Sequence, residues 1–314
     1  GSPQAQGLAG YRERARARNV ALVQRINARL PDIAISYDAD VIPLTPAGVA
    51  TERHIVTAYI SKSKVVFEHP ADAAKFWAGQ LKRIADDVVL LMADTPALEE
   101  TVRSKLVKRG GVGYEQPTAG SFPPVDEFIQ WVLSCGAIPM ITWLDGTSAG
   151  EADGRAMLEC MMAKGAAAIN IIPDRNWNIQ NLEARAVKAA NLAAIVQVAD
   201  CLHLPINIGT EMNKVGLPFV DDLECLALHS HKKTFVRGAC VMVGHSLLSR
   251  YADFSYVGVK AAAEFKDRAA RNAFFEAVGA LPPLDERKAG RLESMGPDKA
   301  LDWFREAVRK GTTE

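Results

Sequence analysis

The decisive stretch of this sequence reads Ala166-Ala167-Ala168-Ile169-Asn170-Ile171-Ile172-Pro173-Asp174-Arg175-Asn176-Trp177-Asn178. Its first part is a short apolar run, and its second part gathers an acid, a guanidinium and two amides within five positions. An apolar run that ends in this way is typical of a buried strand in a parallel sheet, with functional side chains beyond its carboxyl end. A plain turn needs no guanidinium or indole. We therefore predict that Arg175 and Asn176 bind substrate, with Trp177 as a flat apolar wall.

Six further segments have the same strand-like character, and amphipathic segments lie between them. In one of these, Ala74, Trp77, Leu81 and Ile84 share a helical face. Strands that alternate with helices, without a long linker, predict one parallel sheet. We expect a single β/α barrel of seven or eight strands, similar to a TIM barrel, rather than an open doubly wound sheet. The seven predicted strands are 32–42, 64–67, 87–92, 137–143, 166–172, 204–208 and 238–243.

The glycine-rich run Gly110-Gly111-Val112-Gly113 follows a basic helical stretch, whereas a Rossmann loop follows a strand. We therefore expect no nucleotide cofactor. Lys108, just before this run, has two interpretations. It is either a cation at the end of a helix that Gly110 terminates, or part of an anion-binding loop that holds the substrate.

The ends of the chain differ in character from its middle. The segment 11–30 carries six arginines and one acid, and the segment 261–310 holds charged helices interrupted by prolines. We predict an N-terminal helical extension over 1–30, a catalytic barrel over 31–257, and a C-terminal helical extension over 258–314 that packs on the barrel. Both extensions are expected to cap the barrel or to contact another subunit, which makes a homo-oligomer an expected assembly.

Charge and composition exclude several classes of partner. Lys+Arg and Asp+Glu both number 37, so the formal net charge is zero and no bulk attraction to nucleic acid or to an anionic membrane is expected. Five cysteines without a C-x-x-C motif indicate neither a disulfide framework nor a structural zinc site. No apolar run is long enough for a membrane helix. We expect a soluble, cytoplasmic protein with a small-molecule substrate, and an export signal removed before Gly1 stays an alternative.

Charged side chains follow most of the predicted strands, where a β/α barrel builds its active site. Asp145 follows one strand and is predicted to accept a proton from substrate. His245 directly follows the last predicted strand, where an imidazole can bind a metal while a neighbouring acceptor orients the ring. In a barrel these two residues share one rim.

Two more segments supply oxygen and nitrogen ligands. The segment after the strand at 204–208 contains Glu211, a predicted metal ligand or general base, and Asn213 and Lys214, which are predicted to bind substrate. Near the first predicted strand, Asp40 and His54 are further candidate metal ligands.

The order of these features resembles the PHP-type phosphoesterases and, more loosely, the amidohydrolase-like barrels. In the PHP pattern, a histidine that begins an apolar run follows an acid at a strand end, and a late strand ends in Gly-Ser-Asp-x-His. Asp40, His54-Ile55-Val56 and Gly209-Thr210-Glu211-Met212-Asn213 are similar in order and setting, while the family's His-x-His has no counterpart before Arg12. The resemblance implies a distorted barrel around one to three divalent metals that hydrolyses phosphoesters or other polar substrates.

Three functions stay open at this point. The first is a divalent-metal-dependent hydrolase of a small anionic or sugar-derived substrate, with Mn, Zn or Fe bound by Asp40, His54, Glu211 and His245. The second is a metal-free or metal-assisted isomerase, epimerase or lyase of a sugar or sugar acid, with Glu211 as the base and His245 or Lys108 as its catalytic partner. The third is a barrel that binds a ligand without catalysis.

Overall fold

The computed structural model describes residues 1–210, 212 and 219–313, and it divides the chain into two compact units. The N-terminal unit comprises Gly1–Pro124, and the C-terminal unit comprises Val125–Glu314. The boundary falls inside the segment 31–257 to which the barrel was assigned. No described helix combines the length and the apolar character needed to cross a membrane.

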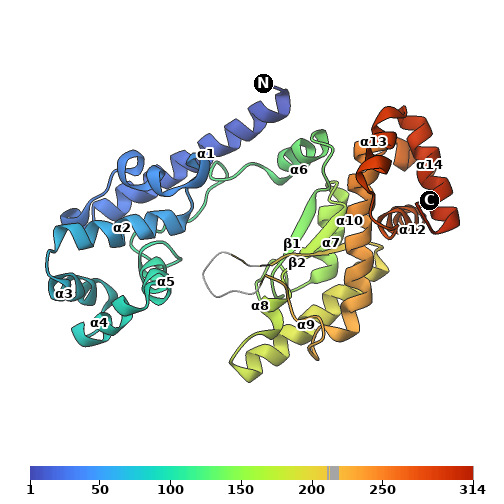
Figure 1. Cartoon of the computed structure of the whole chain (residues 1–314). Helices are drawn as coiled ribbons and strands as arrows, with labels where there is room; N and C mark the ends of the chain where they lie inside the picture. The colour runs from blue at the N-terminus through green and yellow to red at the C-terminus, as the bar shows by residue number, and fades with distance from the viewer. Residues whose placement is uncertain (211, 213–218, 314) are drawn as a thin grey trace. The chain divides into compact units, whose positions relative to one another are not determined.

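The regular elements of the N-terminal unit are all helical, and they end at Leu106, after which the chain runs to Pro124 in turns and loops (Figure 1). Buried hydroxyl and indole groups join its helices. The Tyr59 hydroxyl donates to the Val23 carbonyl oxygen over 3.1 Å, and the Trp77 indole donates to Ser63 over 2.9 Å. Both aromatic side chains belong to one buried core of Leu, Ile, Val and Ala side chains. The helices are α1 (Pro3–Asn27), α2 (Glu52–Val66), α3 (Pro70–Leu81), α4 (Ala85–Ala93) and α5 (Thr95–Leu106), with the short turns η1 (Pro31–Ile33), η2 (Tyr37–Val41), η3 (Ile42–Leu44) and η4 (Pro46–Gly48).

The C-terminal unit is built on a parallel sheet of three strands in the order β1 (Met140–Trp143), β2 (Ala168–Ile171) and β3 (Ile206–Ile208). Helix α7 (Gly154–Ala163) connects β1 to β2, and α8 (Asp174–Trp177) and α9 (Leu182–Cys201) connect β2 to β3. Helix α6 (Val125–Ser134) precedes β1. Alternate strand residues such as Trp143 and Ile169 form a buried apolar core with Leu158 of α7 and Leu192 of α9.

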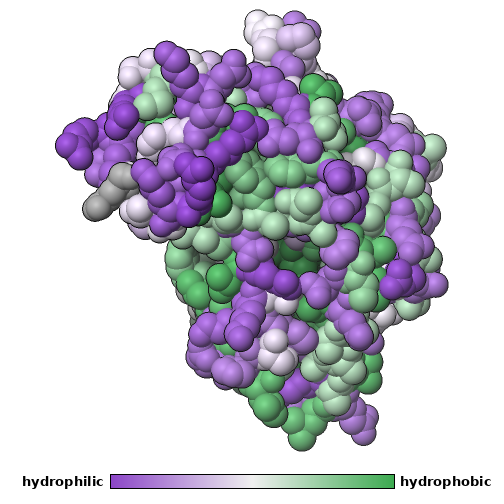
Figure 2. Space-filling model, turned by 90° about the vertical axis from the view of Figure 1, so that its right-hand side faces the viewer, coloured by the Kyte–Doolittle hydropathy of each residue, from purple (hydrophilic) through white to green (hydrophobic). Residues whose placement is uncertain are grey.

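Helix α10 (Lys232–Ala252) runs through the centre of this unit and contacts both the sheet and the C-terminal helices (Figure 1). A Cβ atom at Gly238 would lie 1.8 Å from the carbonyl oxygen of Ile206, so only glycine permits this approach of helix to strand. Figure 2 shows one face of the molecule, with hydrophilic and hydrophobic residues interspersed and a hollow with hydrophobic residues at its base. The remaining elements are η5 (His229–His231), α11 (Val259–Glu264), α12 (Arg268–Gly279), α13 (Glu286–Ser294) and α14 (Pro297–Lys310).

The predicted barrel of seven or eight strands is wrong, because the sheet of the described residues has three strands and is not closed. The strands predicted at 137–143, 166–172 and 204–208 are confirmed. The other four segments are helical: 32–42 contains η1 and η2, 64–67 lies at the end of α2, 87–92 lies in α4, and 238–243 lies in α10. Short apolar runs have the same pattern in a buried strand and in a buried helix, and periodicity alone does not separate them.

Candidate functional site

Polar side chains gather at the carboxyl edge of the sheet, where the chain leaves β1 and β2. We call Asp145, Asp174, Asn176, Lys188 and Asp221 the carboxyl-edge cluster. The first follows β1, the next two lie in α8 directly after β2, Lys188 lies in α9, and Asp221 contacts the start of α8. Ligands of open α/β sheets bind at this edge.

The carboxylate of Asp145 is buried and both of its oxygens are engaged. Oδ1 accepts hydrogen bonds from the Thr147 hydroxyl at 2.5 Å and the Thr147 amide at 3.0 Å, and Oδ2 lies 2.9 Å from Nζ of Lys188. Burial acts to raise the pKa of Asp145, but the hydrogen bonds from Thr147 and Lys188 outweigh it and hold the pKa below its ordinary value. Asp145 is therefore a charged partner for Lys188 instead of a free proton acceptor.

The loop after β1 is fixed by Glu151 and Asn191. The Glu151 carboxylate accepts from the backbone amides of Leu144 at 2.7 Å and Gly146 at 3.2 Å, and the Asn191 amide donates to the Asp145 carbonyl over 2.9 Å. Gly146 has a φ of 73°, and a Cβ there would lie 2.9 Å from Nδ2 of Asn191. The loop therefore holds Asp145 in place before any ligand arrives.

Asn176 is fully buried and holds the loops after β1 and β2 together. Its Nδ2 donates to the carbonyl oxygens of Leu144 at 3.0 Å and Ile172 at 3.1 Å. Its Oδ1 is buried and has no hydrogen-bond partner within the described part of the chain. Such an acceptor is suited to a hydroxyl or amine donor from outside the protein.

Asp221 is only 7% exposed, and its Oδ1 has no hydrogen-bond partner among the residues that the structure describes. Burial raises the pKa of this carboxyl, and the negative charge of Asp174 raises it further. A hydrogen bond from the Asp174 backbone opposes the rise without cancelling it. The Asp174 carboxylate itself accepts from Asn178 at 2.9 Å. Asp221 thus keeps its proton to a higher pH than an exposed aspartate does.

Three of the predicted site residues lie at this edge, namely Asp145, Arg175 and Asn176. Arg175 lies in α8 between Asp174 and Asn176. Glu211, Asn213 and Lys214 fall outside the described residues, so their predicted roles stay predictions.

His245 does not lie at this edge, because it belongs to the interior of α10 and not to the end of a strand. Its Nδ1 accepts from the backbone amide of Tyr256 at 3.2 Å and lies 3.3 Å from the Ser249 hydroxyl. Burial lowers the pKa of His245, and a hydrogen bond with the backbone of Gly136 opposes this effect. Gly136 precedes β1, whereas Asp145 follows it. The prediction that His245 and Asp145 share one rim is therefore wrong.

The remaining predicted residues lie in the N-terminal unit and have local partners. Asp40, in η2, accepts from the Ser36 amide at 2.6 Å. His54, in the first turn of α2, accepts from the Thr51 amide at 3.0 Å as part of a capping box. Lys108 lies just beyond α5, 3.8 Å from Glu52.

Three of the predicted metal ligands make local hydrogen bonds, and the fourth, Glu211, lies outside the described residues. Asp40 and His54 accept from the backbone amides of Ser36 and Thr51, and Nδ1 of His245 accepts from the backbone amide of Tyr256. Within residues 1–210, 212 and 219–313, no three or more His, Cys, Asp or Glu side chains come together in a group that could bind a metal. No group of described residues supports the interpretation of the chain as metal-binding, while the divalent-metal cofactor itself stays a prediction. No step below passes through a metal.

Sequence reasoning missed four residues of this region: Glu151, Lys188, Asn191 and Asp221. Glu151 precedes α7, which begins at Gly154 with Asp153 as its cap, so no helical pattern marks its role in the loop after β1. Lys188 and Asn191 share one face of α9, with i, i+3 spacing, and this spacing was the available signal. Asp221 follows two apolar residues in a segment without a regular pattern, so nothing in the sequence marks its burial.

Comparisons with models of known families, with curated proteins and with solved structures found no match to this chain.

Proposed function

We propose that the carboxyl-edge cluster binds a small, hydroxyl-rich or carboxylate-bearing molecule and exchanges a proton with it. The reaction class is that of isomerases, epimerases and lyases acting on sugars or sugar acids. The observation that carries this proposal is the buried carboxyl of Asp221, with a raised pKa and an Oδ1 that has no partner among the described residues. A buried carboxyl whose pKa is raised is suited to exchanging a proton with a substrate.

The neighbouring groups supply recognition. The buried Oδ1 of Asn176 accepts a substrate hydroxyl, because it has no partner in the described part of the chain. Lys188 directs one interaction to Asp145 and retains further N–H donors for a hydroxyl or carboxylate of the substrate. Asp145 keeps that ammonium in place instead of taking the proton itself.

Asp221 carries the proton in this proposal. Its carboxylate removes a proton from the carbon beside the substrate carbonyl, and the carboxyl so formed exchanges that proton with water. It then returns a proton to the substrate, which restores the carboxylate. The Asp174 carboxylate beside it makes the ionised form less stable, which favours reprotonation. Proton transfer of this kind contributes about 10²–10⁴-fold to a rate.

The experiment is a solvent-exchange assay on the full chain. The protein is incubated in deuterium oxide with a panel of aldoses, ketoses and sugar acids, and incorporation of deuterium into each compound is followed by NMR. Asp221→Asn is expected to reduce exchange by about 10²-fold or more. The matched control is Asp222→Asn at the adjacent, exposed position, which is expected to retain the activity of the parent.

A stability measurement separates loss of chemistry from loss of folding. The folded pKa of Asp221 is raised above its ordinary value of 3.8, so ionisation opposes folding as the pH rises beyond 3.8. Asp221→Asn is therefore expected to be more stable than the parent at neutral pH, with a difference that shrinks towards pH 3.8. If a sugar binds but no deuterium is incorporated, the proposed proton transfer is refuted and the chain is a ligand-binding protein. Equal exchange by Asp221→Asn and the parent would refute the role of Asp221.

A further inference from the structure

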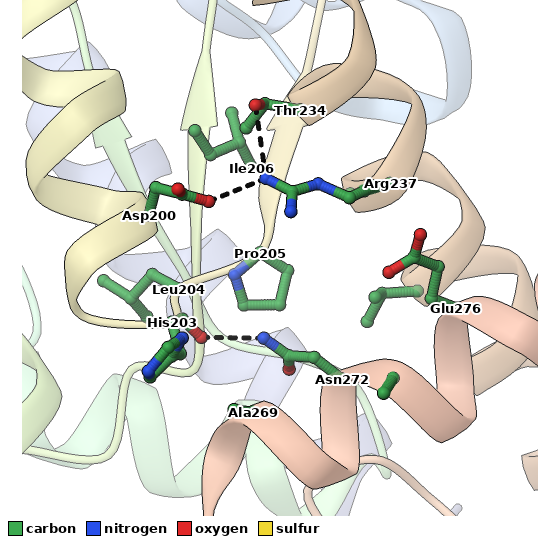
Figure 3. A pocket seen from close by; sticks show the side chains of 13 residues that line it. Asp200, His203, Leu204, Pro205, Ile206, Thr234, Arg237, Ala269, Asn272 and Glu276 are labelled. Atoms are coloured by element: carbon green, nitrogen blue, oxygen red, sulfur yellow. Dashed lines mark hydrogen bonds and ion pairs between the residues drawn. The ribbon is translucent and has the colours of Figure 1, made fainter.

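A pocket of about 240 Å³ lies at the amino end of β3, at the opposite end of the sheet from the carboxyl-edge cluster (Figure 3). Its walls come from the end of α9, the first half of α10, and α12. The polar residues that line it are Asp200, His203, Thr234, Arg237, Asn272 and Glu276. None of these residues takes part in the function proposed above.

The base of the pocket is apolar and its space is kept open by small side chains. Leu204, Pro205 and Val241 are buried where β3 begins against α10. Helix α12 contributes Ala269 and Ala273, whose methyl groups occupy little volume. The pocket therefore combines a small apolar floor with a polar rim, as small-molecule sites do.

The two helices that carry the charged rim are held at a fixed distance. A Cβ at Gly244 of α10 would lie 2.0 Å from the carbonyl oxygen of Phe275, and a Cβ at Gly279 of α12 would lie 1.8 Å from that of Cys240. Backbones in such close contact leave little freedom for the helices to separate. The rim is therefore organised in advance of binding, which reduces the entropic cost of association.

Arg237 is the cationic group of the rim. Its Nη2 donates to Asp200 at 2.7 Å and to the Thr234 hydroxyl at 3.3 Å (Figure 3). Within the described residues, no hydrogen bond engages its Nε or Nη1. A guanidinium with free N–H groups beside a pocket can bind a carboxylate.

Glu276 is the anionic group on the α12 side. Its carboxylate makes no hydrogen bond or ion pair with any residue that the structure describes, and Figure 3 shows it facing the same space as Arg237. Asn272 lies beside His203 and is engaged at both ends of its amide, because it donates to the His203 carbonyl at 2.9 Å and accepts from Tyr256 at 2.5 Å (Figure 3). Asn272 thus connects the turn before β3 to α12. The carboxylate of Glu276 stays available to accept hydrogen bonds from a ligand.

We propose that this pocket binds a small zwitterion of the α-amino acid type, with its carboxylate on Arg237 and its ammonium on Glu276. The charge balance favours a ligand with both charges. A simple carboxylate meets two acids, Asp200 and Glu276, against one guanidinium, and a simple amine leaves the free donors of Arg237 without an acceptor. The volume of about 240 Å³ suits a molecule of amino-acid size.

The test is a binding screen of the full chain against the standard L-amino acids by ligand-observed NMR, followed by calorimetry on the best binder. The same molecule without its amino group, and without its carboxylate, provides the two single-charge probes. We expect each probe to bind at least about tenfold more weakly than the amino acid. Glu276→Gln and Arg237→Met are each expected to weaken binding of the amino acid by about tenfold or more.

The matched controls are Arg250→Met and Glu293→Gln, which alter an exposed ion pair between α10 and α13 outside the pocket and are expected to leave binding unchanged. Glu276→Gln removes no side-chain hydrogen bond or ion pair among the residues that the structure describes, so it keeps the test informative even when Arg237→Met folds poorly. Equal binding of a single-charge probe, unchanged affinity of Glu276→Gln, or no binding by any amino acid at about 10 mM would each overturn the proposal. These outcomes are independent of sugar exchange at the carboxyl-edge cluster.

Discussion

Nζ of Lys188 lies 2.9 Å from Oδ2 of Asp145, and their side chains are only 25% and 10% exposed. This ion pair ties α9 to the loop that follows β1, at the edge of the sheet where the polar groups gather. Because the pair is mostly removed from water, loss of one partner leaves the other charge poorly solvated.

Lys188→Met is expected to destabilise the chain by about 1–3 kcal/mol at neutral pH, since Asp145 then stays buried without its cation. The folded pKa of Asp145 is held below 3.8, so the contribution of the pair is present above pH 3.8 and is lost as the pH falls through the lowered pKa. Urea unfolding as a function of pH measures this effect. The double variant Asp145→Asn with Lys188→Met is the control. Its decrease in the free energy of unfolding is expected to be smaller than the sum of the decreases in the two single variants. Additive losses would show that the two residues do not interact.

Gly146→Ala and Gly136→Ala form a matched pair at two positive φ angles, 73° and 70°. Gly136 has open space where a Cβ would lie, so its substitution is expected to cost about 1–2 kcal/mol of backbone strain. Gly146 faces Asn191 at 2.9 Å, so its substitution is expected to cost about 2–4 kcal/mol. Thermal unfolding of both variants gives the comparison. Equal losses would mean that Asn191 moves aside freely and does not fix the loop.

Gly238→Ala is expected to prevent folding of the C-terminal unit or to destabilise it by more than about 4 kcal/mol, because the new Cβ would lie 1.8 Å from the Ile206 carbonyl oxygen. Gly79→Ala in α3 is the control. No atom lies within 4 Å of its Cβ position, and the better helix propensity of alanine is expected to add about 0.5–1 kcal/mol of stability. Circular dichroism and amide exchange distinguish the two variants. A stable Gly238→Ala protein with native exchange protection of β3 would contradict the close helix–strand contact.

His245 is expected to titrate below 6.5 in an NMR titration, because burial lowers its pKa. A folded pKa below the unfolded value means that protonation opposes folding. Stability is therefore highest above pH 6.5 and falls as the pH drops from 6.5 through the lowered pKa. His245→Gln is expected to remove this part of the pH dependence. An unchanged slope in that variant would assign the effect to other groups.

The sequence by itself determined the three strands at 137–143, 166–172 and 204–208 and the polar character of the chain after them. Each of these runs is short and is followed within two residues by glycine or aspartate. It also placed Asp145 and Asn176 at strand ends, since this depends only on the local pattern.

Only the tertiary structure showed that the other four apolar runs are helical, and only the tertiary structure showed which partners the polar groups have. The run at 238–243 lies in α10, which contacts β3, α12 and α14, and only its Gly238 and Val241 are buried. Its apolar composition is that of a strand, although it forms a helix. Asp145 pairs with Lys188, and His245 contacts Gly136 before β1, so both contacts join residues that are distant along the chain. The burial of Asp221 likewise depends on distant segments. Such contacts depend on how the helices and strands pack, so the local sequence pattern does not predict them.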